Sequence, residues 1–439
     1  MERQRRDPAR QGGPRRSPAL TQRPRRLTMD LTLHDVRAAS APGETLDIGV
    51  KDGRIVEMRP GLPHGDRALD LGGRLVLPGF VETHIHLDKS CILDRCSAQG
   101  DLGEAIAEVA GLKAAFDAED VAARAARTLR KCVVNGTTRM RTHVEVDPVI
   151  GLRGFDGVKA AARDWAWAID VELCVFPQEG LLNNPGTDEL MVAALKDGAG
   201  AVGAAPYTDS DPHGQIDRVF EMAREFDVDI DMHLDFGSDA SALDVEHVCR
   251  RADEHGWGGR VAVGHVTKFA GLAADRFDAL ARRLADAGVA VTVLPSTDLF
   301  LMHRDHADDR NPPRGVTPLH RMAAQGVSCS LSTNNVLNPF TPFGDCSLLR
   351  MANLYANIAQ VGGLGDMAAC FEMVSARSAK LMNLRDYGLA PGAPADLVVI
   401  DASEPGMAVA EIAQPMFGFK AGRPVFTRAL PELHAPLAA

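Results

Sequence analysis

The sequence of 439 residues predicts an α/β fold, a (β/α)8 TIM barrel with a small composite β-sandwich domain formed by both chain ends. Three observations lead to this prediction. Eight apolar strand patterns alternate with helical patterns, short β segments flank this block on both sides, and the predicted barrel strands end in polar residues. An open doubly wound sheet is the alternative, but no G-x-G-x-x-G motif follows a predicted strand.

The amino-terminal residues 1–28 differ from the rest of the chain. They contain nine arginines together with prolines and glycines, and they show no apolar periodicity. Such a segment buries too little apolar surface to fold, so we expect a disordered Arg-rich extension. A basic arm for nucleic acid is the alternative, whereas an upstream-extended start is the simpler explanation.

Short strand patterns occupy residues 29–74, where Asp52 and Gly53 predict a tight hairpin, and they return in residues 385–430. We expect these two segments to meet in one composite β domain, which leaves residues 75–384 for the barrel. The eight barrel strands are predicted at residues 75–86, 137–147, 171–180, 201–206, 229–236, 261–269, 289–295 and 327–335.

Composition restricts the partners of the protein. A net charge of -11 argues against binding to nucleic acid or to an anionic membrane surface. No apolar stretch approaches the roughly 18 residues that span a bilayer. The eight cysteines include no C-x-x-C pair, which is typical of a reduced, cytoplasmic protein. We therefore expect a small-molecule substrate, and a homo-oligomer stays open.

The first barrel strand ends in His84 and His86, which stand two residues apart. Successive side chains of a strand alternate between faces, so both imidazoles point the same way and can hold one metal ion. Further polar residues close the other strands, and the carboxyl ends of barrel strands form the active-site face. They include His143, Glu145, Gln178, Glu179, His233, Asp235, His265, Asp298, Asn334 and Asn335. This set of imidazoles suits Zn, Fe or Mn and leaves positions for water.

Several motifs, in order along the chain, resemble the amidohydrolase superfamily and, within it, the cytosine deaminase-like branch. They are FVETHIHLDKS, RTHVEVD, FPQEG, HLD, GHVTKF and NNVLNPFTPFGD. The resemblance implies one divalent metal ion held by His84, His86 and His233. It also implies that His265 orients or polarises the attacked group and that Gln178 contacts the substrate. No lysine ends the fourth strand, so a single-metal centre is expected.

The chain departs from this branch at two positions. Asn334 stands where relatives have an aspartate that binds metal and accepts a proton, and an amide cannot accept a proton at neutral pH. Phe236 replaces the glutamate that serves cytosine deamination, so we do not expect a true cytosine deaminase. We expect Asn334 as a weak fourth metal ligand, Asp235, Glu179 or His265 as the proton-transfer residue, and Gln178, Asn335 and Phe236 at the substrate.

These observations lead to two hypotheses. The first is a metal-dependent hydrolase of a non-peptide C–N bond, by deamination or amide or amidine hydrolysis, in a small cyclic nitrogenous compound. The intact histidines favour it. The second is a catalytically impaired barrel that binds a small molecule or metal, and Asn334 favours that alternative.

Overall fold

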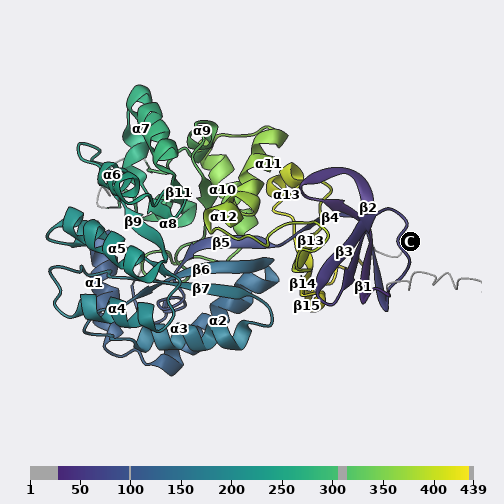
Figure 1. The fold of residues 1–439 in the computed structure, drawn as a ribbon, viewed down its shortest axis with the longest axis horizontal. Helices are drawn as coiled ribbons and strands as arrows, with labels where there is room; N and C mark the ends of the chain where they lie inside the picture. Colours follow the sequence, from purple (N-terminus) through teal and green to yellow (C-terminus); the bar gives the residue numbers. More distant parts are fainter. Residues whose placement is uncertain (1–27, 98–99, 305–313, 435–439) are drawn as a thin grey trace, which may run out of the picture.

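The computed structural model describes residues 28–97, 100–304 and 314–434. Nearly all of the expected Arg-rich extension therefore lies outside the described residues. Two sheets organise the described part of the chain, an eight-stranded parallel sheet and a seven-stranded sheet. Figure 1 shows the smaller sheet beside the helix-covered larger one. No helix of the described ranges is long and apolar enough to cross a membrane.

The larger sheet confirms the predicted barrel. All eight predicted strands are present, they are parallel, and neighbours along the chain are neighbours in the sheet. The first and last strands meet through a parallel bridge between Ile85 and Asn334. His86 N donates to Asn334 O at 3.0 Å, and Asn334 N donates to His84 O at 3.0 Å. The strands are β5 (Phe80–Ile85), β6 (Thr137–Glu145), β7 (Asp170–Phe176), β8 (Ala201–Val202), β9 (Asp229–Leu234), β10 (Val261–His265), β11 (Val289–Val293) and β12 (Cys329–Leu331).

Helices connect and cover these strands because each presents one apolar face to the sheet. In α2, for example, Val121, Ala125, Leu129 and Cys132 recur at helical spacing and are buried, and Asp117 caps the first turn by accepting from Asp120 N at 2.8 Å. The helices are α1 (Leu102–Lys113), α2 (Ala118–Val134), α3 (Arg153–Trp165), α4 (Thr187–Lys196), α5 (Pro212–Phe226), α6 (Val245–His255), α7 (Ala274–Ala287), α8 (Pro295–Leu301), α9 (Leu319–Ala324), α10 (Leu348–Ala359), α11 (Leu364–Glu372), α12 (Ala376–Leu381) and α13 (Pro405–Ala410).

Both chain ends build the smaller sheet, in the order β15-β14-β13-β4-β1-β2-β3. The ends join where β13 pairs antiparallel with β4. The strands expected to form a sandwich are thus hydrogen-bonded into one sheet. They are β1 (Leu31–Ala38), β2 (Ala41–Lys51), β3 (Arg54–Arg59), β4 (Arg67–Leu77), β13 (Leu397–Ile400), β14 (Pro415–Lys420) and β15 (Arg423–Thr427).

The predicted strand 75–86 is divided in the structure. Its first three residues complete β4 of the smaller sheet, and the barrel strand β5 starts only at Phe80. Pro78 and Gly79 separate the two strands, and Gly79 has a φ of 96°, which favours glycine. The smaller sheet therefore extends three residues beyond the boundary expected at residue 74, because proline and a left-handed glycine interrupt the apolar run.

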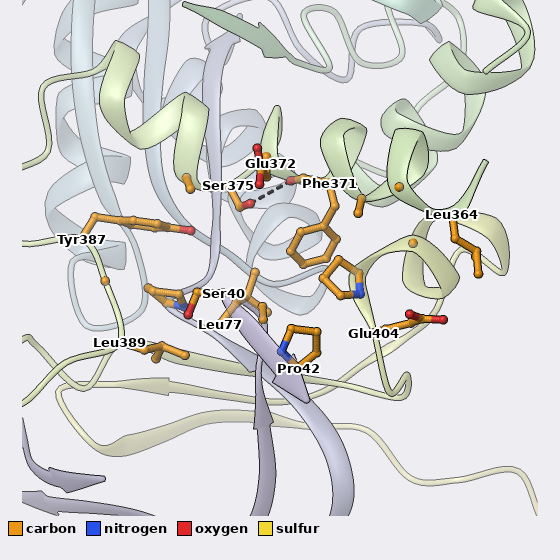
Figure 2. Close-up of a pocket in the computed structure, with 18 residues that line it drawn as sticks. Ser40, Pro42, Leu77, Leu364, Phe371, Glu372, Ser375, Tyr387, Leu389 and Glu404 are labelled. Carbon is orange, nitrogen blue, oxygen red and sulfur yellow. Dashed lines mark hydrogen bonds between the residues drawn. The ribbon is translucent and has the colours of Figure 1, made fainter. Parts of the chain in front are cut away.

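A cavity of about 510 Å³ opens where the smaller sheet meets the barrel helices. Figure 2 shows Leu77, Leu364 and Phe371 among the side chains that line it. Glu372 and Glu404 are its acidic residues, and the residues that could hold a metal ion lie elsewhere in the described chain. The groups suited to catalysis therefore lie outside this cavity, near the carboxyl ends of the barrel strands.

Candidate metal centre and active site

Three buried imidazoles meet at the carboxyl end of the barrel. His84 and His86 extend from β5, and His233 extends from β9. His233 Nε2 lies 3.1 Å from His84 Nε2 and 3.0 Å from His86 Nε2. Nitrogen ligands of a tetrahedral zinc ion, at about 2.0–2.1 Å from the metal, lie roughly 3.3 Å from one another. His233 Nε2 thus lies close to ligand spacing from both of the other ring nitrogens.

The protonation state of these histidines suits metal binding. Burial lowers the pKa of His84 to about 3, and burial lowers the pKa values of His86 and His233 well below the usual range. All three rings are therefore neutral at pH 7, and a neutral imidazole is the form that binds metal. The Oδ1 atom of Asn334 is also buried and has no hydrogen-bond partner in the described structure. The donor set fits a divalent cation.

A carboxylate supports this centre from below. Asp231 Oδ1 lies 3.7 Å from His84 Nδ1 and 3.5 Å from His143 Nε2, and Arg141 Nη1 lies 3.2 Å from Asp231 Oδ2. Burial alone would raise the pKa of Asp231, but His143, His84 and Arg141 hold it well below its usual range. Sequence reasoning missed Asp231 and Arg141. The available signal was a charged residue inside an otherwise apolar strand, which requires a buried partner.

His143 lies in the same histidine cluster, and its ligand atoms are near those of His84 and His233. Its ring stacks on that of His84, with centroids 3.8 Å apart. However, its Nε2 atom faces the backbone oxygen of Asp231 at 3.2 Å. We therefore assign His143 to the support of the ligands, and the expected trio of His84, His86 and His233 remains the proposed ligand set.

His265 faces the centre and is oriented by an aspartate. Its Nδ1 lies 2.6 Å from Asp298 Oδ1, and Asp298 Oδ2 accepts from Leu294 N at 3.1 Å. A carboxylate accepts only, so Nδ1 carries the proton and Nε2 keeps its lone pair. This Nε2 lies 3.4 Å from Asn334 Nδ2. The ring of Phe236 packs edge-on against His265, with centroids 5.2 Å apart.

Lys89 forms another wall of the site, and sequence reasoning did not single it out. Its ammonium donates to Glu145 Oε1 at 2.5 Å and to Gln178 Oε1 at 3.2 Å. It also lies 4.2 Å from the centre of the Phe340 ring. Lys89 is 2% exposed, and a lysine in so buried a position requires paired acceptors. Its place in the motif HLDKS, shortly after the proposed ligand histidines, was the available signal.

The structure does not bring the two expected proton-transfer carboxylates to the pocket. Asp235 accepts from Asp244 N at 3.0 Å and from Val245 N at 3.1 Å, at the start of α6. The two carboxylate oxygens of Glu179 lie 2.5 and 2.6 Å from Lys113 Nζ. Both carboxylates are therefore engaged beside the site, and this geometry does not support the role that their strand-end positions suggested.

A small pocket lies between these groups. Its lining comprises His86, Lys89, Leu102, Gln178, Tyr207, His233, Phe236, His265, Thr297, Leu301, Asn334, Asn335 and Phe340. The expected substrate residues Gln178, Asn335 and Phe236 are all in this set. The space left is about 10 Å³, about enough for one water molecule, so a ring-sized substrate requires movement of side chains at the mouth. None of these described lining residues is an aspartate or a glutamate.

Several residues at the strand ends have a left-handed backbone although they are not glycines. They are Asp235 (φ 48°), His265 (φ 70°), Val266 (φ 46°) and Asn334 (φ 61°). Such residues cost about 1–3 kcal/mol each and cluster at functional sites. Of these four residues, His265 and Asn334 line the pocket.

Comparison with known proteins gives the family. Residues 67–164 and 102–426 match the model of the amidohydrolase family. The chain is 26% identical over 389 residues to N-isopropylammelide isopropyl amidohydrolase of Pseudomonas sp. (strain ADP), covering 86% of this chain and 92% of the relative. It is 28% identical to pterin deaminase of Rhizobium rhizogenes, covering 81% of this chain and 82% of that protein.

Solved structures agree with this result. The crystal structure of 5-methylcytosine deaminase from Klebsiella pneumoniae with 5-fluorocytosine superposes with a TM-score of 0.87 at 26% identity, covering 92% of this chain and 99% of that one. N-isopropylammelide isopropylaminohydrolase from Burkholderia multivorans superposes with a TM-score of 0.79 at 28% identity, covering 90% and 97%. The family match spans most of the chain, including every strand of the barrel, and the chain therefore belongs to the amidohydrolase family.

Proposed function

We propose that this protein hydrolyses a C–N bond of a small cyclic amide or amidine, with one divalent ion (Zn, Fe or Mn) held by His84, His86 and His233. The convergence of three neutral, buried imidazoles beneath a pocket that also contains His265 carries this proposal. When bound, such an ion supplies Lewis-acid chemistry and lowers the pKa of water towards about 7. The family membership and the substrates named for the relatives support the reaction class.

His265 is the proposed proton-transfer residue. Because Asp298 fixes the proton on Nδ1, Nε2 can accept a proton from the attacking water. The resulting imidazolium can then give that proton to the leaving nitrogen. Asp298 acts as a positioning residue, since it holds the ring orientation and tautomer. His265 thus takes the proton-transfer role expected for Asp235 or Glu179, whose carboxylates are bonded to backbone N–H groups of residues 244 and 245 and to Lys113.

The remaining pocket side chains favour a flat, polar ring. Phe236 and Phe340 offer aromatic faces, and Lys89 and Gln178 offer donors on one side. Asn335 Oδ1 accepts from Asn338 Nδ2 at 2.7 Å, which fixes the orientation of the Asn335 amide at the wall of the pocket. A ring with an oxo or imino group opposite its leaving amine matches this arrangement. Phe236 cannot shuttle a proton, so we propose that cytosine is not the substrate.

A release assay tests the proposal. Protein loaded separately with Zn, Fe or Mn is incubated with pterin, N-isopropylammelide, 5-methylcytosine and further cyclic amidines, and released ammonia or amine is measured. We expect release from at least one ring compound and none from a matched His233→Ala variant. Absence of release from every member, by protein whose metal content is measured, would contradict hydrolysis.

Asn334 favours a second candidate function, in which the barrel binds a ring compound without turnover. A neutral amide lies where a proton acceptor would serve the reaction. Calorimetry on the same panel separates the two functions. Binding of a ring compound without any product release favours the impaired barrel, whereas product release excludes it.

A further inference from the structure

The amide of Asn334 is held in an unusual way for a buried asparagine. Asn334 is 1% exposed. Its Oδ1 atom has no hydrogen-bond partner in the described structure, and its Nδ2 atom lies 3.4 Å from His265 Nε2. Buried polar atoms without a partner are rare in folded proteins and indicate an additional ligand or a chemical role. Here the unpartnered oxygen belongs to the same functional group that the proposed reaction cleaves, an amide C–N bond.

We propose that Asn334 is a self-modification site, at which the protein hydrolyses its own side-chain amide and converts residue 334 into an aspartate. The inference rests on the proposed function, because it uses the same water, His265 and metal-binding histidines. The consequence is a carboxylate in a pocket whose described lining residues include none.

The step balances with water as the co-reactant. A water oxygen adds to Cγ of Asn334 while His265 Nε2 takes one proton from that water. The Cγ–Nδ2 bond then breaks, its electron pair stays on nitrogen, and His265 returns the proton to Nδ2. Ammonia leaves and a carboxylic acid remains, which ionises. A divalent ion on the three imidazoles would assist by polarising the amide.

The geometry places the proton-transfer residue at the leaving atom. His265 Nε2 lies beside Nδ2, and Asp298 stabilises the imidazolium that forms during the step. General acid and base catalysis by a positioned histidine accelerates such steps about 10²–10⁴-fold. Only one turnover is possible in each molecule, because the product is part of the chain.

The backbone disfavours the ordinary route of asparagine deamidation, in which the next backbone nitrogen attacks Cγ to form a cyclic imide. That route requires rotation of the peptide group that follows Asn334. The carbonyl of this peptide accepts from His86 N at 3.0 Å, and the N–H of the preceding peptide donates to His84 O at 3.0 Å, so the barrel closure holds the backbone on both sides of the Asn334 Cα atom. Direct hydrolysis gives only a normal aspartate, whereas the imide also gives isoaspartate.

Two nearby asparagines provide internal controls. Asn335 Oδ1 accepts from Asn338 Nδ2, and Asn338 Oδ1 accepts from Phe340 N and Thr341 N at 3.1 Å. Both amide oxygens are therefore satisfied, and within the described residues neither amide forms a hydrogen bond with His265. We expect Asn335 and Asn338 to keep their amides under conditions that convert Asn334.

The experiment follows the mass of the peptide that contains these three asparagines. Protein purified with a chelator is loaded with Zn, incubated, digested at successive times and sequenced by fragmentation in a mass spectrometer, with Asn334→Asp as the end-point standard. We expect a gain of about one dalton at residue 334 alone, as normal aspartate, in metal-loaded wild type. Chelated protein, His265→Ala and Asp298→Asn should convert at least tenfold more slowly.

Each other result overturns the inference. An intact amide after metal loading, with metal bound by elemental analysis, refutes it while leaving the proposed function standing if the release assay is positive. Equal conversion in chelated protein and in both variants, or isoaspartate at position 334, shows spontaneous deamidation instead. Failure to bind metal, together with an unchanged mass, would refute the inference and the proposed function together.

Discussion

Replacement of Asp298 by asparagine tests the proposed role of His265 most directly. One carboxylate oxygen accepts from His265 Nδ1 at 2.6 Å and the other accepts from Leu294 N at 3.1 Å. An asparagine can satisfy only one of these donors. If its oxygen takes the Leu294 bond, its NH2 group faces His265 Nδ1 and forces the ring proton onto Nε2, which then cannot accept a proton from water.

The expected loss follows from this change of tautomer. Loss of a positioned general base costs about 10²–10⁴-fold in rate, and an analogous aspartate-to-asparagine change in serine proteases costs about 10⁴-fold. We therefore expect kcat of Asp298→Asn to fall at least 100-fold, with a mispaired buried hydrogen bond costing about 1–3 kcal/mol of stability. The assay is release of ammonia or amine from the compound selected by the screen, at equal metal content.

Asp235→Asn is the matched control. Its carboxylate is also buried, but it accepts from two backbone groups, Asp244 N and Val245 N, whereas Asp298 accepts from the pocket residue His265. We expect its kcat to fall less than Asp298→Asn by a factor of about ten or more. Full activity in Asp298→Asn, or an equal loss in Asp235→Asn, would refute the assignment of proton transfer to the His265 pair.

Three further predictions concern metal, substrate and stability. His233→Ala removes the ring that links the other two ligands, so metal content by elemental analysis should fall to less than about one tenth of wild type, and full occupancy would contradict the ligand set. Lys89→Met removes the donor to Gln178 but keeps the apolar stem, so KM should rise about tenfold or more at unchanged metal content, whereas an unchanged KM would remove Lys89 from the substrate site. Burial and Glu145 raise the pKa of Glu179 from 4.5 to about 7 despite its bonds to Lys113. The neutral form of Glu179 therefore contributes to the free energy of unfolding fully below about pH 4.5, and this contribution, at most about 3 kcal/mol, is lost as the pH rises through 7. Urea unfolding should show that the free energy of unfolding decreases less between pH 5 and pH 8 in Glu179→Gln than in wild type.

Much of the barrel could be predicted because its signals are local. Apolar strands of a parallel sheet and amphipathic helices have different periodicities, and both can be recognised from short windows of sequence. The three histidines proposed as metal ligands could be singled out for the same reason, since each ends an apolar strand. The division of residues 75–86 between two sheets was missed because the apolar pattern continues through Pro78 and Gly79.

The pairing of side chains within the site could not be predicted in this way. Asp298 was recognised as a strand-end residue, but its hydrogen bond to His265 spans 33 positions of sequence. Asp235 and His265 both follow or end strands with a left-handed backbone, yet one side chain turns to the backbone of α6 and the other to the pocket. The backbone is left-handed at both positions and neither is a glycine, so the sequence carries no signal that separates their roles.

The charges around the centre determine how the side chain at position 334 affects metal binding. Asp231 beneath the histidines is already paired with Arg141, and Lys89 adds a positive charge to the pocket wall. The nearby carboxylates Asp231 and Glu145 are thus already paired with cations, and none of the described pocket-lining residues is a carboxylate. Two unit charges 4 Å apart interact by about 4 kcal/mol at the effective dielectric of such sites, so one new carboxylate at position 334 would strengthen metal binding substantially. Metal affinity of freshly loaded protein should accordingly be weaker than that of Asn334→Asp and should approach it as the mass at residue 334 changes. If freshly loaded wild type and Asn334→Asp bound metal with identical affinity at the first time point, the charge at position 334 would not affect metal binding and this prediction would be wrong.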